Sequence, residues 1–119
     1  MAKVTTLHTP DDLQAVLDAS QDGPVALLKT SIACPISARG QEQFVQLEND
    51  ADPPLYGLVV QYARPLSNHI AETLGVEHQT PQAIVIHEGE AVFHASHHHI
   101  TAGRLRDAAR RAVGEPTVG

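Results

Sequence analysis

The chain of 119 residues has few aromatic side chains, few basic side chains and only one cysteine. A single cysteine excludes an intramolecular disulfide and favours a reducing compartment. With no tryptophan and 3% aromatic residues, the chain offers little surface on which nucleic-acid bases could stack. The 8 lysines and arginines are outnumbered by 14 aspartates and glutamates, and the net charge of −6 argues against non-specific binding to nucleic acid.

Long hydrophobic runs are also missing. The longest apolar stretches, residues 55–60 and 83–86, are far shorter than the roughly 20 residues that span a bilayer. Residues 1–6 contain no apolar stretch of the length found in a signal peptide. We therefore expect a cytoplasmic protein without a membrane or nucleic-acid partner, formed by a single domain of residues 1–119 whose tail, from about residue 114, is frayed.

The one cysteine, Cys34, stands between a short apolar segment, residues 25–28, and a helical pattern that opens on Pro35. The apolar segment is typical of a buried strand. A thiol at the start of a helix lies near the positive end of the helix dipole and near unpaired N–H groups, which both favour the thiolate. We therefore interpret Cys34 as a nucleophile rather than a buried structural thiol, and expect its pKa to lie below that of a free thiol.

Ser37 occupies the position at which a dithiol oxidoreductase carries its second cysteine. Any disulfide of Cys34 must therefore be formed with an external thiol. Ser37 lies one helical turn beyond Cys34, so its hydroxyl or its N–H can donate to the thiolate; the alternative is a plain surface serine. Pro35 suits the first helical position because it has no N–H, and it leaves the remaining donors of the first turn facing Cys34.

The rest of the chain alternates strands and helices. We expect strands at residues 4–7, 25–29, 55–60, 82–86 and 91–95. A first helix should begin at Thr9-Pro10 and end at Gly23-Pro24, and further helices should cover about residues 35–47, 64–74 and 101–113. This alternation predicts right-handed crossovers and a mixed sheet with helices on both faces. Residues 87–90 predict a hairpin turn that adds antiparallel strands at one side, and Gly75 predicts a helix stop.

This order of elements, with the cysteine at the start of the second helix, resembles thioredoxin, an α/β three-layer sandwich. Thr80-Pro81 directly precedes the fourth strand, where thioredoxin-like proteins keep a cis-proline that faces the cysteine. An X–Pro bond is trans by default. The resemblance implies that the bond before Pro81 is cis, and that Thr80 offers backbone groups to the incoming thiol.

More closely, the chain resembles the monothiol bacilliredoxins, the thioredoxin-like proteins of the bacillithiol system, over about residues 13–112. The motifs that carry this resemblance are Cys34-Pro35-Ile36-Ser37 and Arg64-Pro65-Leu66-Ser67-Asn68, supported by Pro54-Leu55-Tyr56, Gln61, Leu74-Gly75-Val76, Pro81-Gln82, His94-Ala95-Ser96-His97 and Ile100-Thr101. The chain departs from the family pattern at His98-His99 and at Ala33.

The resemblance implies an activity. The Cys34 thiolate would attack a protein mixed disulfide of bacillithiol, release the client protein and become bacillithiolated itself. Bacillithiol is then a co-substrate rather than a bound cofactor, and a second thiol or a regenerating redox protein restores Cys34. The resemblance places Ala33, Ile36, Thr80 and Pro81 in contact with the bound thiol.

Arg64 is a candidate ligand for the carboxylates of the malate group of bacillithiol, because arginine binds carboxylates in a bidentate manner; the alternative is a solvated or capping charge. The histidines at positions 94, 97, 98 and 99 suggest a metal site. Adjacent residues of an extended strand point to opposite faces, however, and no cysteine or carboxylate stands at ligand spacing. We expect exposed polar residues and no metal, and we assign no role to His97, His98 and His99.

Several other interpretations stay open. One alternative is a non-catalytic thioredoxin-fold binding module whose Cys34 is thiolated under oxidative stress. Another is a redoxin that uses glutathione or coenzyme A. An iron–sulfur carrier like the monothiol glutaredoxins is a further class, but these carry Gly-Phe where this chain has Pro35-Ile36. A peroxidatic role is disfavoured, because the threonine and arginine pattern of peroxiredoxins is missing around Cys34. Turnover distinguishes an enzyme from a binding module.

Overall fold

The computed structural model describes residues 4–32, 35–48 and 52–114. Its strands are β1 (Val4–Thr6), β2 (Val25–Thr30), β3 (Leu55–Val59), β4 (Gln82–His87) and β5 (Glu90–Ser96). Its helices are α1 (Pro10–Ala19), α2 (Pro35–Phe44), α3 (Arg64–Leu74) and α4 (Ala102–Ala112), with short 3-10 helices η1 (Val60–Tyr62) and η2 (His97–His99). All strands and helices that the alternating sequence predicts are present, with ends that differ by a few residues.

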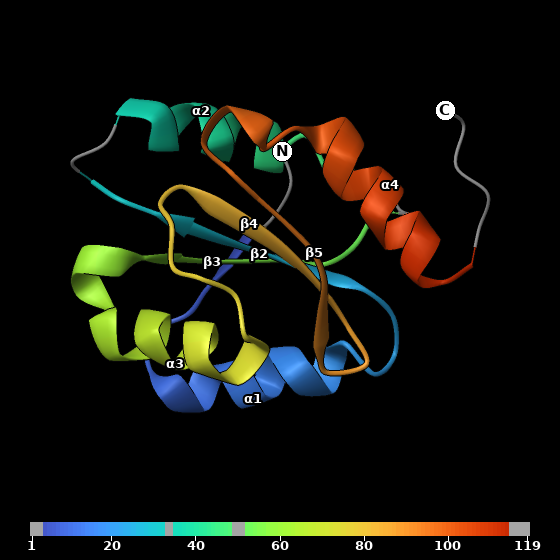
Figure 1. Ribbon diagram of the computed structural model, residues 1–119, viewed down its shortest axis with the longest axis horizontal. Helices are drawn as coiled ribbons and strands as arrows, with labels where there is room; N and C mark the ends of the chain where they lie inside the picture. The colour runs from blue at the N-terminus through green and yellow to red at the C-terminus, as the bar shows by residue number, and fades with distance from the viewer. Residues whose placement is uncertain (1–3, 33–34, 49–51, 115–119) are drawn as a thin grey trace.

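The strands form one mixed sheet in the order β1-β3-β2-β4-β5. Strands β1, β3 and β2 are parallel, whereas β4 pairs antiparallel with β2 and β5 pairs antiparallel with β4. Helices α1 and α3 cover one face of the sheet and α2 and α4 the other (Figure 1). The predicted α/β sandwich of three layers is confirmed; β3 is an internal strand, as its apolar sequence indicates, and β2 is the middle one.

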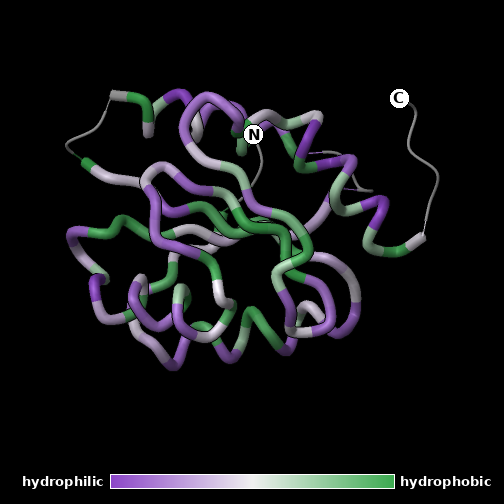
Figure 2. The backbone as a smooth tube through the Cα atoms, viewed as in Figure 1, coloured by the Kyte–Doolittle hydropathy of each residue, from purple (hydrophilic) through white to green (hydrophobic). Residues whose placement is uncertain are grey.

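Two hydrophobic cores lie on the two faces of the sheet. Successive residues of β2 alternate between them: Val25 and Leu27 pack with α1 and α3, and Ala26 and Leu28 pack on the opposite side with Phe44 of α2. The apolar residues therefore gather in the strands between the helices (Figure 2). Full burial of a side chain the size of leucine contributes about 1.5–3 kcal/mol, so these two cores supply most of the stabilising free energy.

The helix ends follow the capping residues of the sequence. Thr9 precedes α1 in an extended conformation, and the Asp12 carboxylate accepts the main-chain N–H groups of Thr9 at 3.0 Å and His8 at 2.7 Å. These bonds hold the pKa of Asp12 below its usual value. Gly75 ends α3 in the left-handed conformation, with φ of 67°, and donates its N–H to Ala71. Helix α1 ends at Ala19, earlier than the sequence suggests.

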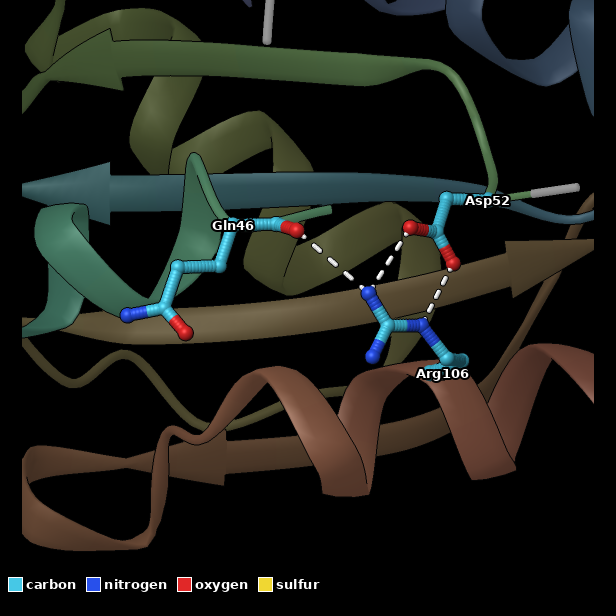
Figure 3. A network of polar contacts seen from close by, with 3 residues as sticks. All are labelled: Gln46, Asp52 and Arg106. Carbon is cyan, nitrogen blue, oxygen red and sulfur yellow. Dashed lines mark hydrogen bonds and ion pairs between the residues drawn. The ribbon is translucent and has the colours of Figure 1, made fainter. Parts of the chain in front are cut away.

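An ion pair ties α4 to the loop before β3. The guanidinium of Arg106 donates to both carboxylate oxygens of Asp52, at 2.7 and 2.9 Å, and to the carbonyl oxygen of Gln46 at 3.3 Å (Figure 3). Both the hydrogen bonds and the charge of Asp52 raise the pKa of Arg106. None of the helices within the described ranges is long and apolar enough to cross a membrane.

Candidate active site

Four strand ends meet at one edge of the sheet. In the pairing register, Thr30 at the end of β2 lies opposite Val59 at the end of β3. Gln82, at the start of the antiparallel strand β4, pairs with Lys29 on one side and with Ser96 at the end of β5 on the other. The loop after β2, η1, the Thr80-Pro81 peptide and η2 therefore all leave the sheet at the same edge. Loops at such an edge commonly carry the functional groups of open α/β sheets.

The predicted nucleophile lies in one of these loops. Cys34 and its neighbour Ala33 lie outside the described residues, so their predicted roles stay predictions. Helix α2 begins at Pro35, as expected from the sequence, and Ile36 in its first turn is half-buried. In the sequence, Cys34 directly precedes the first residue of α2, within the segment that joins β2 to this helix.

Ser37 is not a surface serine. Its side chain is 4% exposed, and its hydroxyl oxygen accepts the main-chain N–H of Ser31 at 3.0 Å. The bond joins the first turn of α2 to the residue that follows β2, across the segment that contains Cys34. The proton of the Ser37 hydroxyl is not used in this bond, so donation to the thiolate stays a prediction.

Gln61 of η1 holds the same loop from the other side. Its Nε2 donates to the hydroxyl oxygen of Ser31 at 2.6 Å, and its Oε1 accepts the main-chain N–H of Ile32 at 3.2 Å. A single amide side chain therefore fixes two successive residues of the loop, Ser31 and Ile32. From the sequence, Gln61 was expected only as part of a family motif; its position two residues beyond the end of an internal strand is the signal that could have identified it.

The Thr80-Pro81 peptide is cis, as predicted. Pro81 is buried, and its carbonyl oxygen accepts the main-chain N–H of His97 at 3.0 Å. A β-carbon added to Gly40 of α2 would lie 3.4 Å from the Cβ of Pro81 and 3.4 Å from the Cδ1 of Ile100. Pro81 is therefore packed between α2 and the segment that follows β5.

A buried lysine, for which the sequence predicted no role, lies behind this edge. Lys29 of β2 is fully buried; its Nζ lies 3.2 Å from the carbonyl oxygen of Ser67 and 3.3 Å from Nδ1 of His78. Burial lowers the pKa of Lys29 to about 8. The signal in the sequence is one charged residue within an otherwise apolar strand.

His78 joins this cluster from the loop before Pro81. The hydroxyl of Ser67 also lies 3.2 Å from its Nδ1. Desolvation lowers the pKa of His78, and the charges of Lys29 and Arg64 lower it further. Nδ1 of a neutral His78 is then the acceptor for the Lys29 ammonium group. Arg64, the first residue of α3, is exposed, which agrees with either of its two interpretations.

Contrary to expectation, the histidines of η2 do not lie on an extended strand. His97, His98 and His99 form a 3-10 helix rather than an extended strand, because the main chain of His97 turns into the left-handed region with φ of 56°. Within the described ranges, no three histidine, cysteine, aspartate or glutamate side chains gather in a way that could hold a metal ion. His99 instead lies 3.3 Å from a guanidinium nitrogen of Arg104.

The comparisons with known proteins agree with this architecture. A family model described as monothiol bacilliredoxin BrxC matches residues 5–105. A solved structure described as a putative oxidoreductase with a thioredoxin fold is 34% identical, with a TM-score of 0.80, over 88% of this chain and 92% of that chain.

Two thioredoxins share the fold at lower identity. Thioredoxin f from spinach chloroplast, in its short form, is 19% identical, with a TM-score of 0.73, over 95% of this chain and 96% of its own. Fasciola hepatica thioredoxin is 15% identical, with a TM-score of 0.71, over 92% of this chain and 99% of its own. The expected thioredoxin-like fold is confirmed.

Proposed function

Because the chain belongs to the monothiol bacilliredoxin family, we propose that it removes bacillithiol from protein mixed disulfides, with Cys34 as the nucleophile. The observation that carries the proposal is the Cys34-Pro35-Ile36-Ser37 motif at the start of α2, with a buried serine where a second cysteine would act. One thiol at a helix start can form a mixed disulfide but has no internal partner that could resolve it.

The exchange step balances without an added oxidant. The Cys34 thiolate attacks the bacillithiol sulfur of the mixed disulfide, and a new S–S bond forms as the old one breaks. The client cysteine leaves as a thiolate with the electron pair of the broken bond and takes a proton from solvent. The products are a reduced client protein and bacillithiolated Cys34.

A second exchange returns the protein to its starting state. An external thiol, either free bacillithiol or a cysteine of a regenerating redox protein, attacks the disulfide of Cys34 and carries the bacillithiol away as a new disulfide. The partners are therefore bacillithiolated client proteins, bacillithiol and a reductant. The reaction serves redox homeostasis in the cytoplasm, and it needs no bound cofactor.

The side chains around the site have distinct roles in this proposal. The hydroxyl of Ser37 and the N–H groups of the first turn of α2, which begins at Pro35, stabilise the thiolate. The main chain at Thr80 and the ring of Pro81 hold the thiol that approaches Cys34. Gln61 is a positioning residue, because its two hydrogen bonds fix Ser31 and Ile32 at the entry of the loop.

Intact-mass analysis tests the proposal. Reduced protein is mixed with a client protein that carries bacillithiol on a known cysteine. We expect the client to lose the bacillithiol mass and this protein to gain it, and we expect Cys34→Ser to abolish both changes. Parallel clients that carry glutathione or coenzyme A test the choice of thiol. Transfer of these thiols but not of bacillithiol would overturn the specificity, and no transfer at all would leave a binding module.

A further inference from the structure

A cleft lies beside Pro81, between α2 and the segment that runs from η2 into α4. Its volume is about 370 Å³, within the range of roughly 300–1,000 Å³ that is usual for small-molecule sites. The residues that line the cleft are Arg39, Gly40, Glu42, Gln43, His97, His98, Ile100 and Thr101. Charged and polar side chains thus form most of the wall, and the apolar contribution comes mainly from Ile100.

The cleft adjoins the candidate active site directly. Gly40 and Ile100 both line it, and a β-carbon on Gly40 would lie 3.4 Å from the Cβ of Pro81 and 3.4 Å from the Cδ1 of Ile100. His97 in the opposite wall donates its main-chain N–H to the carbonyl oxygen of Pro81. Pro81 is buried and does not line the cleft itself, but a thiol bound beside Pro81 would have this cleft as its neighbour.

Arg39 brings a positive charge to the cleft that no carboxylate in the described residues neutralises at ion-pair distance. Three of the other basic side chains are engaged or distant: Lys29 is buried behind the sheet, Arg106 is paired with Asp52, and Arg111 is at the far end of α4. Arg39 is the one lysine or arginine among the residues that line the cleft, in a chain with a net charge of −6. Guanidinium groups bind carboxylates in a bidentate manner.

His97 gives a second, independent indication. Its φ of 56° lies in the left-handed region, which glycine adopts readily and other residues adopt at a cost of about 1 kcal/mol. The chain nevertheless carries an exposed histidine here, with its main chain held by Pro81. A strained residue in the wall of a polar cleft is typical of a position at which the side chain has a function.

We propose that this cleft binds the carboxylate-bearing end of the low-molecular-weight thiol, with Arg39 as the main anion ligand and with His97, His98 and Thr101 as further hydrogen-bond partners. The inference rests on the proposed function and assigns to Arg39 the role that the sequence suggested for Arg64. Glu42 in the same wall suits a thiol that carries an ammonium group as well as carboxylates, as cysteine-derived thiols do.

Two mixed disulfides of one client protein test the assignment, one with bacillithiol and one with 2-mercaptoethanol, which has no charge. We expect Arg39→Gln to slow release of the bacillithiolated client about tenfold, the usual effect of one charge-assisted hydrogen bond. Release of the mercaptoethanol-modified client should change less than about twofold, since that thiol does not reach the cleft. The matched control Arg111→Gln removes the same charge far from the cleft and should leave both rates unchanged.

The variant His97→Gly separates binding from folding. It relieves the left-handed strain, so its melting temperature should not fall, whereas its rate with the bacillithiolated client should decrease. If Arg39→Gln lowers the release rates of both clients equally, or lowers neither, the assignment is overturned. If the wild-type protein transfers no bacillithiol at all, the proposed function fails instead.

A direct binding measurement does not depend on turnover. Malate is titrated into the labelled protein and followed by amide NMR shifts. We expect the amides of Gly40, Ile100 and Thr101 to shift in the wild-type protein and not in Arg39→Gln. Shifts that are confined to the start of α3, around Arg64, would place the carboxylates there and overturn the inference.

Discussion

The ammonium nitrogen of Lys29 lies 3.2 Å from the main-chain carbonyl oxygen of Ser67, between the middle strand of the sheet and α3. The side chain of Lys29 is fully buried, and its neighbours are neutral acceptors rather than a carboxylate. Removal of a charged group from water is unfavourable, and neutral hydrogen bonds offset only part of that loss. This imbalance is the reason why the pKa of Lys29 falls to about 8.

The stability of the protein should therefore change at alkaline pH. The folded pKa of Lys29 lies near 8 and its ordinary value is 10.5, so between these values the unfolded chain binds more protons than the folded one. The free energy of unfolding then rises with pH across this window. We expect Lys29→Met to remove that rise and to increase the free energy of unfolding at neutral pH by about 1–3 kcal/mol.

Urea unfolding at neutral pH and near pH 10 measures this difference. All other titrating groups are common to the wild-type protein and to Lys29→Met, so only the difference between the two pH dependences matters. If the free energy of unfolding changes with pH in the same way in both proteins, Lys29 ionises alike in the folded and the unfolded state.

His78 should report the charge of Lys29. Protonation of its Nδ1 would bring a second cation to 3.3 Å from the Lys29 ammonium group, and this repulsion adds to the desolvation that lowers the pKa of His78 below 6.5. The unfolded chain binds more protons just below pH 6.5, so the free energy of unfolding decreases as the pH falls through that window. We expect Lys29→Met to raise the pKa of His78.

Ring-proton NMR over pH 4–8 checks this expectation. His69 on α3 serves as the reference, because its ring contacts Thr73 rather than Lys29. A His78 titration that is the same in both proteins would exclude the electrostatic coupling.

Features that local sequence determines were predicted well. The capping residue Thr9, the stop at Gly75 and the alternation of strands and helices each depend on residues a few positions apart, and the structure confirms them. The resemblance added the cis peptide at Pro81 and the family. These are patterns whose physical cause lies within one or two turns of chain or within a known motif.

Features that depend on distant partners were missed. The acceptors of Lys29 are 38 and 49 residues away in the sequence, so the strand pattern indicated its burial but not its surroundings. His97 adopts its left-handed turn next to the carbonyl of Pro81, the residue before β4, and an alternating pattern cannot reveal this. In the sequence, Arg39 is an ordinary charge on a helix surface; only the fold brings the segment after β5 to the same cleft.

The thiol of Cys34 should titrate below the ordinary value of a free thiol, because the N–H groups at the start of α2 favour its charged form. The rate of alkylation by iodoacetamide, measured against pH, gives this pKa. Because the thiolate is the reactive form, the rate should reach its plateau at a lower pH than that of a free cysteine model compound. A plateau at or above the pH found for the model compound would weaken the assignment of Cys34 as the nucleophile.

The Arg106 ion pair should contribute to stability and not to catalysis. The side chain of Asp52 is 3% exposed and that of Arg106 27%, and the pair lies near the start of β3, away from the edge that carries the site. We expect Arg106→Met to lower the free energy of unfolding by about 2–3 kcal/mol, because the Asp52 carboxylate loses both guanidinium bonds. The control Arg111→Met, at the exposed end of α4, should change it by less than about 0.5 kcal/mol.

Urea unfolding and the bacillithiol-transfer rate are measured on the same preparations of these two variants. The rate of Arg106→Met should equal that of the wild-type protein at a temperature where both are folded. A slower rate in folded Arg106→Met would mean that this network influences the site through α4.

Ser37 and Gln61 should act together, because both hold Ser31. The main-chain N–H of Ser31 donates to Ser37, and the hydroxyl of Ser31 accepts from Gln61. Each bond therefore holds Ser31 in the position from which the other bond can form. We expect Ser37→Ala to lower the free energy of unfolding by about 1–2 kcal/mol and Gln61→Ala by about 1 kcal/mol. The double variant should lose less free energy of unfolding than the two single variants lose together, with a coupling energy of at least about 0.5 kcal/mol.

The transfer rate distinguishes a shared effect on the loop from two separate losses of stability. If the bonds position the loop before Cys34, either single variant slows transfer several-fold and the second substitution adds little. Gln14→Ala on α1 is the matched control, since it removes an amide bond to Asp18 on the surface and should leave the rate unchanged. Additive losses in both stability and rate would mean that the two side chains act on the loop independently, and the positioning role of Gln61 would then not depend on Ser31.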